Sequence, residues 1–333
     1  LSLVGSEMCI RDSLYAHEYL RVIFGGILCT MAYNIAASIL RSLGDSRTPL
    51  YFLILSSFLN IVLDIFFIAT LHMGTAGAAW ATVLSQGISA LLCFWYMFHN
   101  YNNLRLSIRD LYPDPYRILC MIQSGIPMAL NQTVTAFGIM ILQSGINQFG
   151  SSVMAAYTAA SKLESLVMQP MIALGSGIST YCAQNIGARK TKRIFVGVRS
   201  TMLLSLGAAI LGMALYGIAS KAILRIFLSD PSPEMVHYAL QYLYTSVWFL
   251  LFLAWIFLFR NALVGLGNGL ITIIGGVAEL LCRFLCIHFL LQPFGFWCIC
   301  LTNPITWIVA CSLFCGFYFR WEHQQKHCSK SAR

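Results

Sequence analysis

Three carboxylates lie inside long apolar segments of the sequence, where an ionised side chain needs a specific reason to be present. They are Asp64, Glu164 and Glu279. If such a segment crosses a membrane, a charge at its centre costs roughly 2.5–3.5 kcal/mol on insertion scales, so it is usually paired or functional. These three residues are therefore the first candidates for chemistry.

Asp64 has the most suggestive neighbours. It follows Asn60 by four residues, so both side chains lie on one helix face. Thr82 follows in the next apolar segment, within a Gly- and Ala-rich run that permits close helix packing. A carboxylate, an amide oxygen and a hydroxyl can hold Na⁺, and the carboxylate can instead take a proton. We predict a cation-coupling site, with Na⁺ as the possible metal, at Asn60, Asp64 and Thr82; the alternative is a protonated Asp64 that only joins helices.

The other two carboxylates need partners of their own. Glu279 precedes Arg283 by four residues, which predicts an ion pair within one helix. That pair could be internally neutralised or could bind substrate. Glu164 lies two residues after Lys162, so the two side chains point to different faces and cannot pair.

Several polar residues could line a wet cavity or simply bond between helices. The candidates are Asn34, Gln132, Gln143, Glu164, Glu279 and Arg283. The sequence has no Walker loop, HExxH or GxSxG motif, and its seven His are scattered. We therefore expect no catalytic residue, no enzyme activity and no cofactor beyond the coupling ion.

The composition shows what kind of chain carries these residues. Hydrophobic residues make up 58% of its 333 residues and charged residues 10%, with a mean hydropathy of +0.73. A soluble domain carries roughly 25% charged residues. This composition indicates a polytopic membrane protein and excludes a soluble nucleic-acid binder. The net charge of +9 then reflects the Lys/Arg excess of cytoplasmic loops.

Long apolar runs predict an all-α fold, since about 20 apolar residues span a bilayer as a helix. Nine spans are expected, at roughly 17–41, 49–71, 75–99, 117–149, 152–186, 195–228, 234–265, 269–291 and 295–319. The basic loop residues follow alternate spans. The positive-inside rule therefore predicts that the basic tail ends in the cytoplasm.

An internal repeat organises these spans. A shift of 223 residues places Leu40 to Gly44 on Leu263 to Gly267. Two parallel copies predict two helical bundles related by an axis along the membrane normal. We expect the second half of a first bundle (three helices) at 14–99, a cytoplasmic linker at 100–116, a six-helix second bundle at 117–320 and a basic cytoplasmic tail at 321–333. Residues 1–13 resemble a non-native, adapter-derived peptide, which predicts an N-terminally truncated chain.

Four sequence stretches together resemble bacterial transporters of the multidrug and toxic compound extrusion (MATE) family. They are Leu40 to Pro49, Asn60 to Asp64, Gly74 to Thr82 and Gln184 to Ala188. The resemblance covers about residues 15–320. It implies a two-lobe bundle of twelve helices, of which this chain would hold the fourth to the twelfth.

The resemblance also implies roles for particular residues. Some family members bind a cation in the first lobe through a first-helix Asp, an Asn-x-x-x-Asp pair and a Thr. The pair and the Thr fall on Asn60, Asp64 and Thr82, and the first-helix Asp would lie outside this chain. Other members use a seventh-helix Glu, but the corresponding stretch from Pro127 to Gln143 contains no carboxylate.

The implied function is secondary active antiport. The protein would export organic cations or drugs in exchange for Na⁺ or H⁺ by alternating access, as a monomer in the bacterial cytoplasmic membrane. Its partners would be small organic cations and membrane lipids, with no nucleic acid.

Three other functions remain open. A flippase of related fold for lipid-linked oligosaccharides or peptidoglycan precursors would need a strongly cationic cavity, and only Lys162, Arg260 and Arg283 are cations at membrane depth. A membrane-embedded enzyme would need His or Asp clusters at the interface. A receptor or scaffold would leave Asp64 without a role.

Overall fold

The computed structural model describes residues 15–101, 112–227 and 232–331, and these residues contain helices and turns but no strand. The expected all-α, polytopic membrane fold is thus confirmed. The chain divides into two compact units, Leu1–Pro113 and Asp114–Arg333, which we call the N-unit and the C-unit. Residues 1–13, expected to be non-native, lie outside the described residues.

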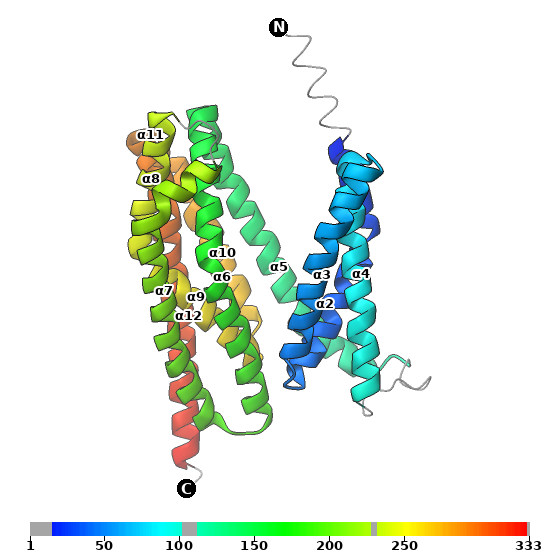
Figure 1. Ribbon diagram of the computed structural model, residues 1–333. Helices are drawn as coiled ribbons and strands as arrows, with labels where there is room; N and C mark the ends of the chain where they lie inside the picture. The colour runs from blue at the N-terminus through cyan, green and yellow to red at the C-terminus, as the bar shows by residue number, and fades with distance from the viewer. Residues whose placement is uncertain (1–14, 102–111, 228–231, 332–333) are drawn as a thin grey trace. The chain divides into compact units, whose positions relative to one another are not determined.

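The N-unit is a small helical group in which α4 packs against both of its neighbours (Figure 1). Its elements are a helix Tyr15–Gly25, α2 Ile27–Ser42, α3 Arg47–Ile65, the π-helix η1 Phe66–Thr70 and α4 Gly74–Asn100. The first helix and α2 form one pair bent by 45°. The bend lies at Gly26, which touches α4: a Cβ atom there would stand 2.2 Å from a methyl carbon of Val83.

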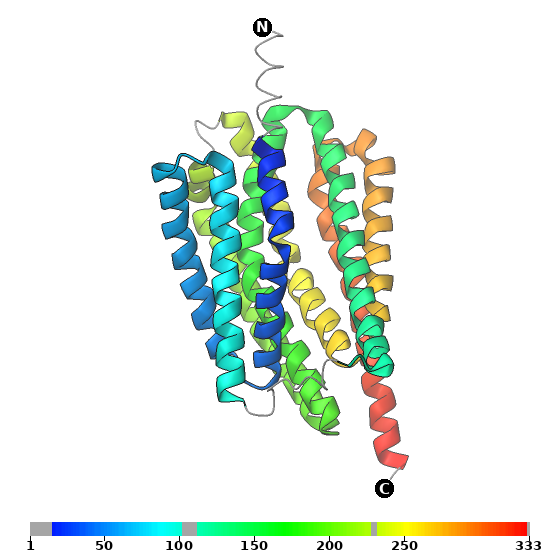
Figure 2. The same ribbon diagram turned by 90° about the vertical axis from the view of Figure 1, so that its right-hand side faces the viewer.

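The C-unit is larger and holds the main hydrophobic core. Its elements are α5 Pro115–Ile146, the 3₁₀ turn η4 Asn147–Phe149, α6 Ser151–Gly187, α7 Thr191–Phe227, α8 Pro233–Ser246, the 3₁₀ turn η5 Val247–Phe249, α9 Leu250–Gly265, α10 Leu270–Leu285, the π-helix η6 Cys286–Leu290, α11 Leu291–Phe294 and α12 Phe296–Ser331. Helix α6 packs against α7, α8 and α9, whereas α10 packs against α5 and α12 (Figure 2).

Helices α6 and α9 approach each other closely because one of them carries a glycine at the contact. A Cβ atom on Gly265 of α9 would lie 2.2 Å from the Ser179 carbonyl oxygen of α6. No side chain fits in that space. This contact fixes the spacing of the two helices that carry Glu164 and Arg260.

Most expected spans are helices that are apolar enough to cross a membrane. Seven such helices lie among the described residues, or eight if the bent pair around Gly26 is one span. The remaining expected span, 152–186, forms the continuous helix α6, and α6 is not among these candidate membrane-spanning helices. Its sequence is rich in Ser, Thr, Gln and Asn, and its neighbours α7, α8 and α9 cover much of its surface.

The two units share an element order that follows the sequence repeat. In the N-unit, and in α8 to α12 of the C-unit, a broken helix is followed by a tight turn, a helix that runs into a π segment, and a long final helix. The turn glycines Gly44 and Gly267 have φ of 92° and 84°, and Gly74 and Gly295 have φ of 57° and 54°. Glycine is favoured at all four because side chains rarely adopt positive φ.

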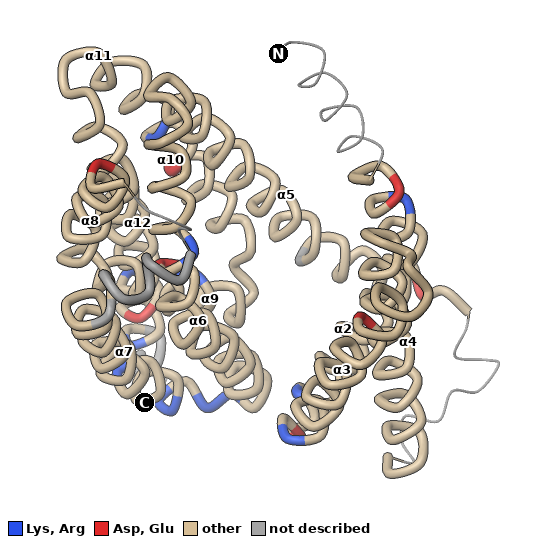
Figure 3. Tube along the Cα trace, turned by 45° about the horizontal axis from the view of Figure 1, so that its top comes forward, with Lys and Arg blue, Asp and Glu red and all other residues tan. Residues whose placement is uncertain are grey.

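Several basic residues gather at helix ends. In Figure 3 they mark the turn between α6 and α7 and the end of α12. Helix α12 continues to Ser331, so the described part of the expected tail is helical. Glu322, only 4% exposed, accepts a hydrogen bond from Lys326 and lies 3.6 Å from Arg199 of α7. These contacts join the end of α12 to α7.

Candidate functional site

Helices α3 and α4 of the N-unit bring Asn60 and Thr82 together. The Asn60 Nδ2 atom lies 3.5 Å from Thr82 Oγ1, and the Thr82 hydroxyl donates to the Ala78 carbonyl at 3.0 Å. Farther along the same interface, Ser89 donates to the Phe52 carbonyl at 3.1 Å. These contacts set the register of two antiparallel helices, with Asn60 opposite Thr82.

Asp64 lies one turn beyond Asn60 on the same face of α3. Its side chain is partly buried, and its Oδ1 atom is buried without a hydrogen-bond partner among the described residues. An unpaired buried carboxylate oxygen is costly unless a proton or a cation satisfies it. The structure therefore places the three expected residues along one interface and leaves an acceptor open at Asp64. We call Asn60, Asp64 and Thr82 the α3–α4 cluster.

Gln86 carries a second open acceptor that the sequence analysis did not single out. Its Oε1 atom is also buried without a partner in the described chain, and it lies one turn after Thr82 on the same face of α4. Because the helices are antiparallel, Gln86 and Asp64 lie on opposite sides of the Asn60–Thr82 contact. At 1.5 Å per residue they are about 12 Å apart along the helices. Gln86 thus belongs to the same interface but not to the surroundings of Asp64.

Asn34, the other polar candidate of the N-unit, is exposed on α2. Its side-chain amide donates to the Thr30 carbonyl at 2.9 Å. Together with Thr30 and Ser38 it lines an open hollow of about 440 Å³. In the described part of the chain, its hydrogen bond stays within α2 and does not reach the α3–α4 cluster.

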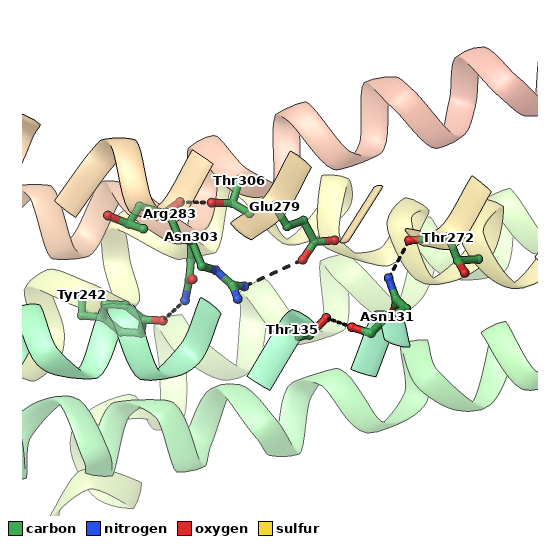
Figure 4. Close-up of polar contacts among 9 residues, drawn as sticks. Asn131, Thr135, Tyr242, Thr272, Glu279, Arg283, Asn303 and Thr306 are labelled. Atoms are coloured by element: carbon green, nitrogen blue, oxygen red, sulfur yellow. Dashed lines mark hydrogen bonds and ion pairs between the residues drawn. The ribbon is translucent and has the colours of Figure 1, made fainter. Parts of the chain in front are cut away.

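In the C-unit, Glu164 is buried in a network that crosses three helices. Its Oε2 atom accepts a 2.7 Å hydrogen bond from the Tyr242 hydroxyl of α8, and Tyr242 in turn accepts from Asn303 of α12 at 2.8 Å (Figure 4). The Glu164 Oε1 atom is buried without a partner among the described residues. Lys162 is exposed, so the two side chains lie apart as the sequence spacing required.

Glu279 and Arg283 form the expected pair within α10, and both are 7% exposed. The Arg283 Nη2 and Glu279 Oε2 atoms are 3.9 Å apart (Figure 4), which is the long end of an ion pair. The Nε and Nη1 atoms of Arg283 are buried without a hydrogen-bond partner in the described chain. The pair neutralises charge but leaves part of the guanidinium unsatisfied.

The two glutamines expected in the C-unit have different surroundings. Gln132 is exposed and lines a small cavity near Arg260. Gln143 is partly buried and donates to Asn147 Oδ1 at 3.2 Å. This contact joins residues four apart in one helical run, so it is not the bond between helices that was the alternative interpretation of Gln143.

Tyr242, Asn303 and Asn131 are polar residues that the sequence analysis missed. Asn131 of α5 is 5% exposed and donates to the Thr272 carbonyl of α10 at 2.6 Å (Figure 4). Each of these residues bonds to a partner at least 61 positions away. Local spacing gives no signal for such contacts; the only available signal is an isolated amide or Tyr in an apolar run.

Comparison with known proteins identifies the family of this chain. The MatE family model matches residues 13–66 and 127–294. The probable multidrug resistance protein YpnP of Bacillus subtilis is 32% identical over 228 residues, which are 68% of this chain and 50% of that protein. The probable multidrug resistance protein NorM of Thermotoga maritima is 28% identical over 221 residues, 65% of this chain and 47% of that protein. The chain spans about half the length of these curated relatives.

Solved structures show the same fold. A crystal structure of a MATE in complex with MaL6 superposes with a TM-score of 0.85 at 22% identity, covering 93% of this chain and 70% of that one. An outward-facing multidrug resistance MATE transporter gives a TM-score of 0.83 at 23% identity, with coverage of 93% and 70%. The resemblance inferred from the sequence is confirmed: this multi-pass membrane chain belongs to the MATE family.

Proposed function

We propose that the protein is a secondary active antiporter of the bacterial cytoplasmic membrane, which exports organic cations in exchange for Na⁺ or H⁺. Family membership supports the transport class. The observation that supports the coupling role is the open, buried Oδ1 atom of Asp64, one turn from the Asn60–Thr82 contact.

The coupling ion binds at the α3–α4 cluster. Asp64 supplies the charge, and the Asn60 amide and Thr82 hydroxyl supply neutral oxygens. Na⁺ is a hard cation that prefers such oxygens, and a proton would neutralise Asp64 instead. Either ligand removes the cost of the unpaired Asp64 oxygen. Ion binding therefore favours the conformation in which α3 packs against α4.

Ion binding and export are linked through the conformations of the transporter. If the ion and the substrate favour different conformations, each weakens the binding of the other by the same factor. An inward ion gradient then drives the substrate outward. This exchange requires no chemical change in either ligand, so no catalytic residue is involved.

Transport in everted membrane vesicles tests this proposal. We expect vesicles containing the protein to take up ethidium when an ion gradient is imposed, and Asp64→Asn to abolish that uptake. Asp45→Asn is the matched control, because Asp45 is the acid of the α2–α3 turn in the same unit. Ethidium uptake at the unsubstituted rate in Asp64→Asn, with equal amounts of protein in the membrane, would refute the coupling role.

A further inference from the structure

The C-unit contains a small cavity, lined in part by polar side chains, that the proposed coupling site does not use. It has a volume of about 190 Å³ and lies among α5, α6, α9 and α10. Its polar lining residues are Asn131, Gln132, Ser176, Arg260, Asn261 and Thr272. None of them is a carboxylate, and one is an arginine.

Arg260 is the only charged residue that lines this cavity among the described residues, and it forms no ion pair there. Its guanidinium carbon lies 5.2 Å from the centre of the Phe257 ring. No carboxylate of the described chain lies within ion-pair distance of it. The opposing charge that acts on it through space is Glu279.

Glu279 is shared between two arginines. Both Arg260 and Arg283 act on it electrostatically, and the ion pair that it forms with Arg283 is long, at 3.9 Å. The other buried acid near Arg283 is Glu164, whose hydrogen bond goes to Tyr242. Neither acid supplies Arg260 with a hydrogen-bonded counter-ion.

We propose that this cavity binds an anionic group, a phosphate or a carboxylate, on the Arg260 guanidinium. A partly desolvated guanidinium is costly without a counter-ion, and its planar fork matches the oxygens of both anions. The surrounding amides and hydroxyls are hydrogen-bonding groups of the kind that orient a polar ligand. The site is distinct from the α3–α4 cluster and goes beyond the proposed function.

The size of the cavity limits what enters it. Drug-sized ligands occupy pockets of about 300–1,000 Å³, so a cavity of about 190 Å³ holds one acidic group with few further atoms. A free phosphate fits this description, and so does the headgroup phosphate of a lipid whose tails remain outside. An organic cation does not, because Arg260 repels it.

Anion binding to the purified chain tests the proposal. The 333-residue chain in a neutral detergent is titrated with inorganic phosphate against chloride at equal ionic strength, and thermal unfolding is followed by Trp fluorescence. We expect phosphate to stabilise the protein, by an amount that rises with the logarithm of its concentration once this exceeds the Kd. Arg260→Gln should weaken the apparent affinity about tenfold or more, as expected for a charged hydrogen-bonding group.

Glu279→Gln gives the discriminating result, because the two interpretations predict different outcomes for it. If the cavity binds anions, removing the acid that competes for Arg260 strengthens phosphate binding. If Arg260 serves only to pair with Glu279, phosphate has no effect on either protein. Arg260→Lys keeps the charge but loses the fork, and should bind phosphate with intermediate affinity.

Two control variants isolate the cavity from other cations and from the coupling site. Lys162→Gln removes an exposed cation of the same unit, and Asp64→Asn removes the coupling acid. Both should bind phosphate as the unsubstituted chain does, so this proposal and the proposed function can fail independently. If Arg260→Gln does not fold, Arg260→Lys and Glu279→Gln carry the test.

A second arm identifies the source of the anion. Micelles containing a short-chain phosphatidylglycerol are compared with micelles containing the matching phosphatidylcholine. Stabilisation by free phosphate supports a soluble ligand, and stabilisation by phosphatidylglycerol alone supports a lipid headgroup. If neither anion stabilises the chain, or if Arg260→Gln binds either one with unchanged affinity, the proposal is overturned.

Discussion

The Tyr242 hydroxyl donates to a Glu164 oxygen at 2.7 Å. The other oxygen of this buried carboxyl group has no hydrogen-bond partner among the described residues. Tyr242→Phe removes the donor and leaves both carboxyl oxygens without one. We expect a loss of about 1–3 kcal/mol in the free energy of unfolding, the usual cost of an unsatisfied buried polar group. Thermal or denaturant unfolding in detergent measures it.

Tyr244→Phe is the matched control for that substitution. Tyr244 lies on the same helix but is 42% exposed, so removal of its hydroxyl should change stability by less than about 0.5 kcal/mol. Equal losses in the two variants would show that the Glu164 contact contributes nothing specific.

The close contact between α6 and α9 predicts a glycine requirement at Gly265. In Gly265→Ala the new methyl group meets the Ser179 carbonyl oxygen at 2.2 Å, and backbone cannot move aside as a flexible side chain can. We expect a loss of roughly 1–3 kcal/mol from overpacking. Gly177→Ala on α6, where nothing lies within 4 Å, should instead gain about 0.5–1 kcal/mol from higher helix propensity. A neutral Gly265→Ala would argue against this helix spacing.

The end of α12 is predicted to depend on Glu322. Its side chain is 6% exposed and lies near Lys326 and Arg199, so Glu322→Gln loses the charge that both cations contact. We expect about 1–3 kcal/mol of destabilisation, together with faster amide hydrogen exchange in residues 321–327. Arg320→Gln, an exposed change on the same helix, should leave that exchange unaltered. Unchanged exchange in Glu322→Gln would contradict the assigned contacts.

The α2–α3 turn should weaken in acid through Asp45. Slight burial raises the pKa of Asp45, but hydrogen bonds from Thr48 and from the Arg47 backbone N–H outweigh it, so the pKa lies below its ordinary value. An acid with a lowered folded pKa stabilises the folded state above its unfolded pKa, and this contribution is lost as the pH falls through the folded pKa.

Amide exchange or unfolding followed from neutral to acidic pH tests the role of Asp45. We expect a pH-dependent loss of stability that is smaller in Asp45→Asn, because Asn also accepts these backbone hydrogen bonds but does not titrate in this range. If stability falls identically with pH in the two proteins, Asp45 is not the cause of the acid-dependent loss of stability.

Sequence spacing predicted the contacts that lie within one helix or across one short turn. The four-residue separations of Asn60 from Asp64 and of Glu279 from Arg283 indicated shared faces, and the turn to α4 brings Thr82 opposite Asn60. Helical periodicity carries this information because residues four apart lie one above the other. The same spacing could not show that Arg283 keeps two unsatisfied nitrogens.

Contacts between distant helices could not be predicted in this way. Tyr242 reaches Glu164 across 78 positions, and Asn131 reaches Thr272 across 141, so both depend on tertiary packing rather than on periodicity. The π segments after Ile65 and Leu285 could not be predicted either, because they change the backbone hydrogen-bond spacing without changing the pattern of apolar residues. Helix α6 was expected as a membrane span. It is rich in polar residues because it packs among other helices.

Ion binding measured on the purified protein tests whether the open carboxylate oxygen of Asp64 holds the coupling ion. Radioactive sodium binding and proton release are measured on the purified 333-residue chain, on Asp64→Asn and on the control Asp45→Asn. We expect one of the two ions to bind with measurable affinity, Asp64→Asn to abolish this binding, and Asp45→Asn to preserve it. Binding of the same ion with unchanged stoichiometry and affinity in Asp64→Asn would contradict this role of Asp64.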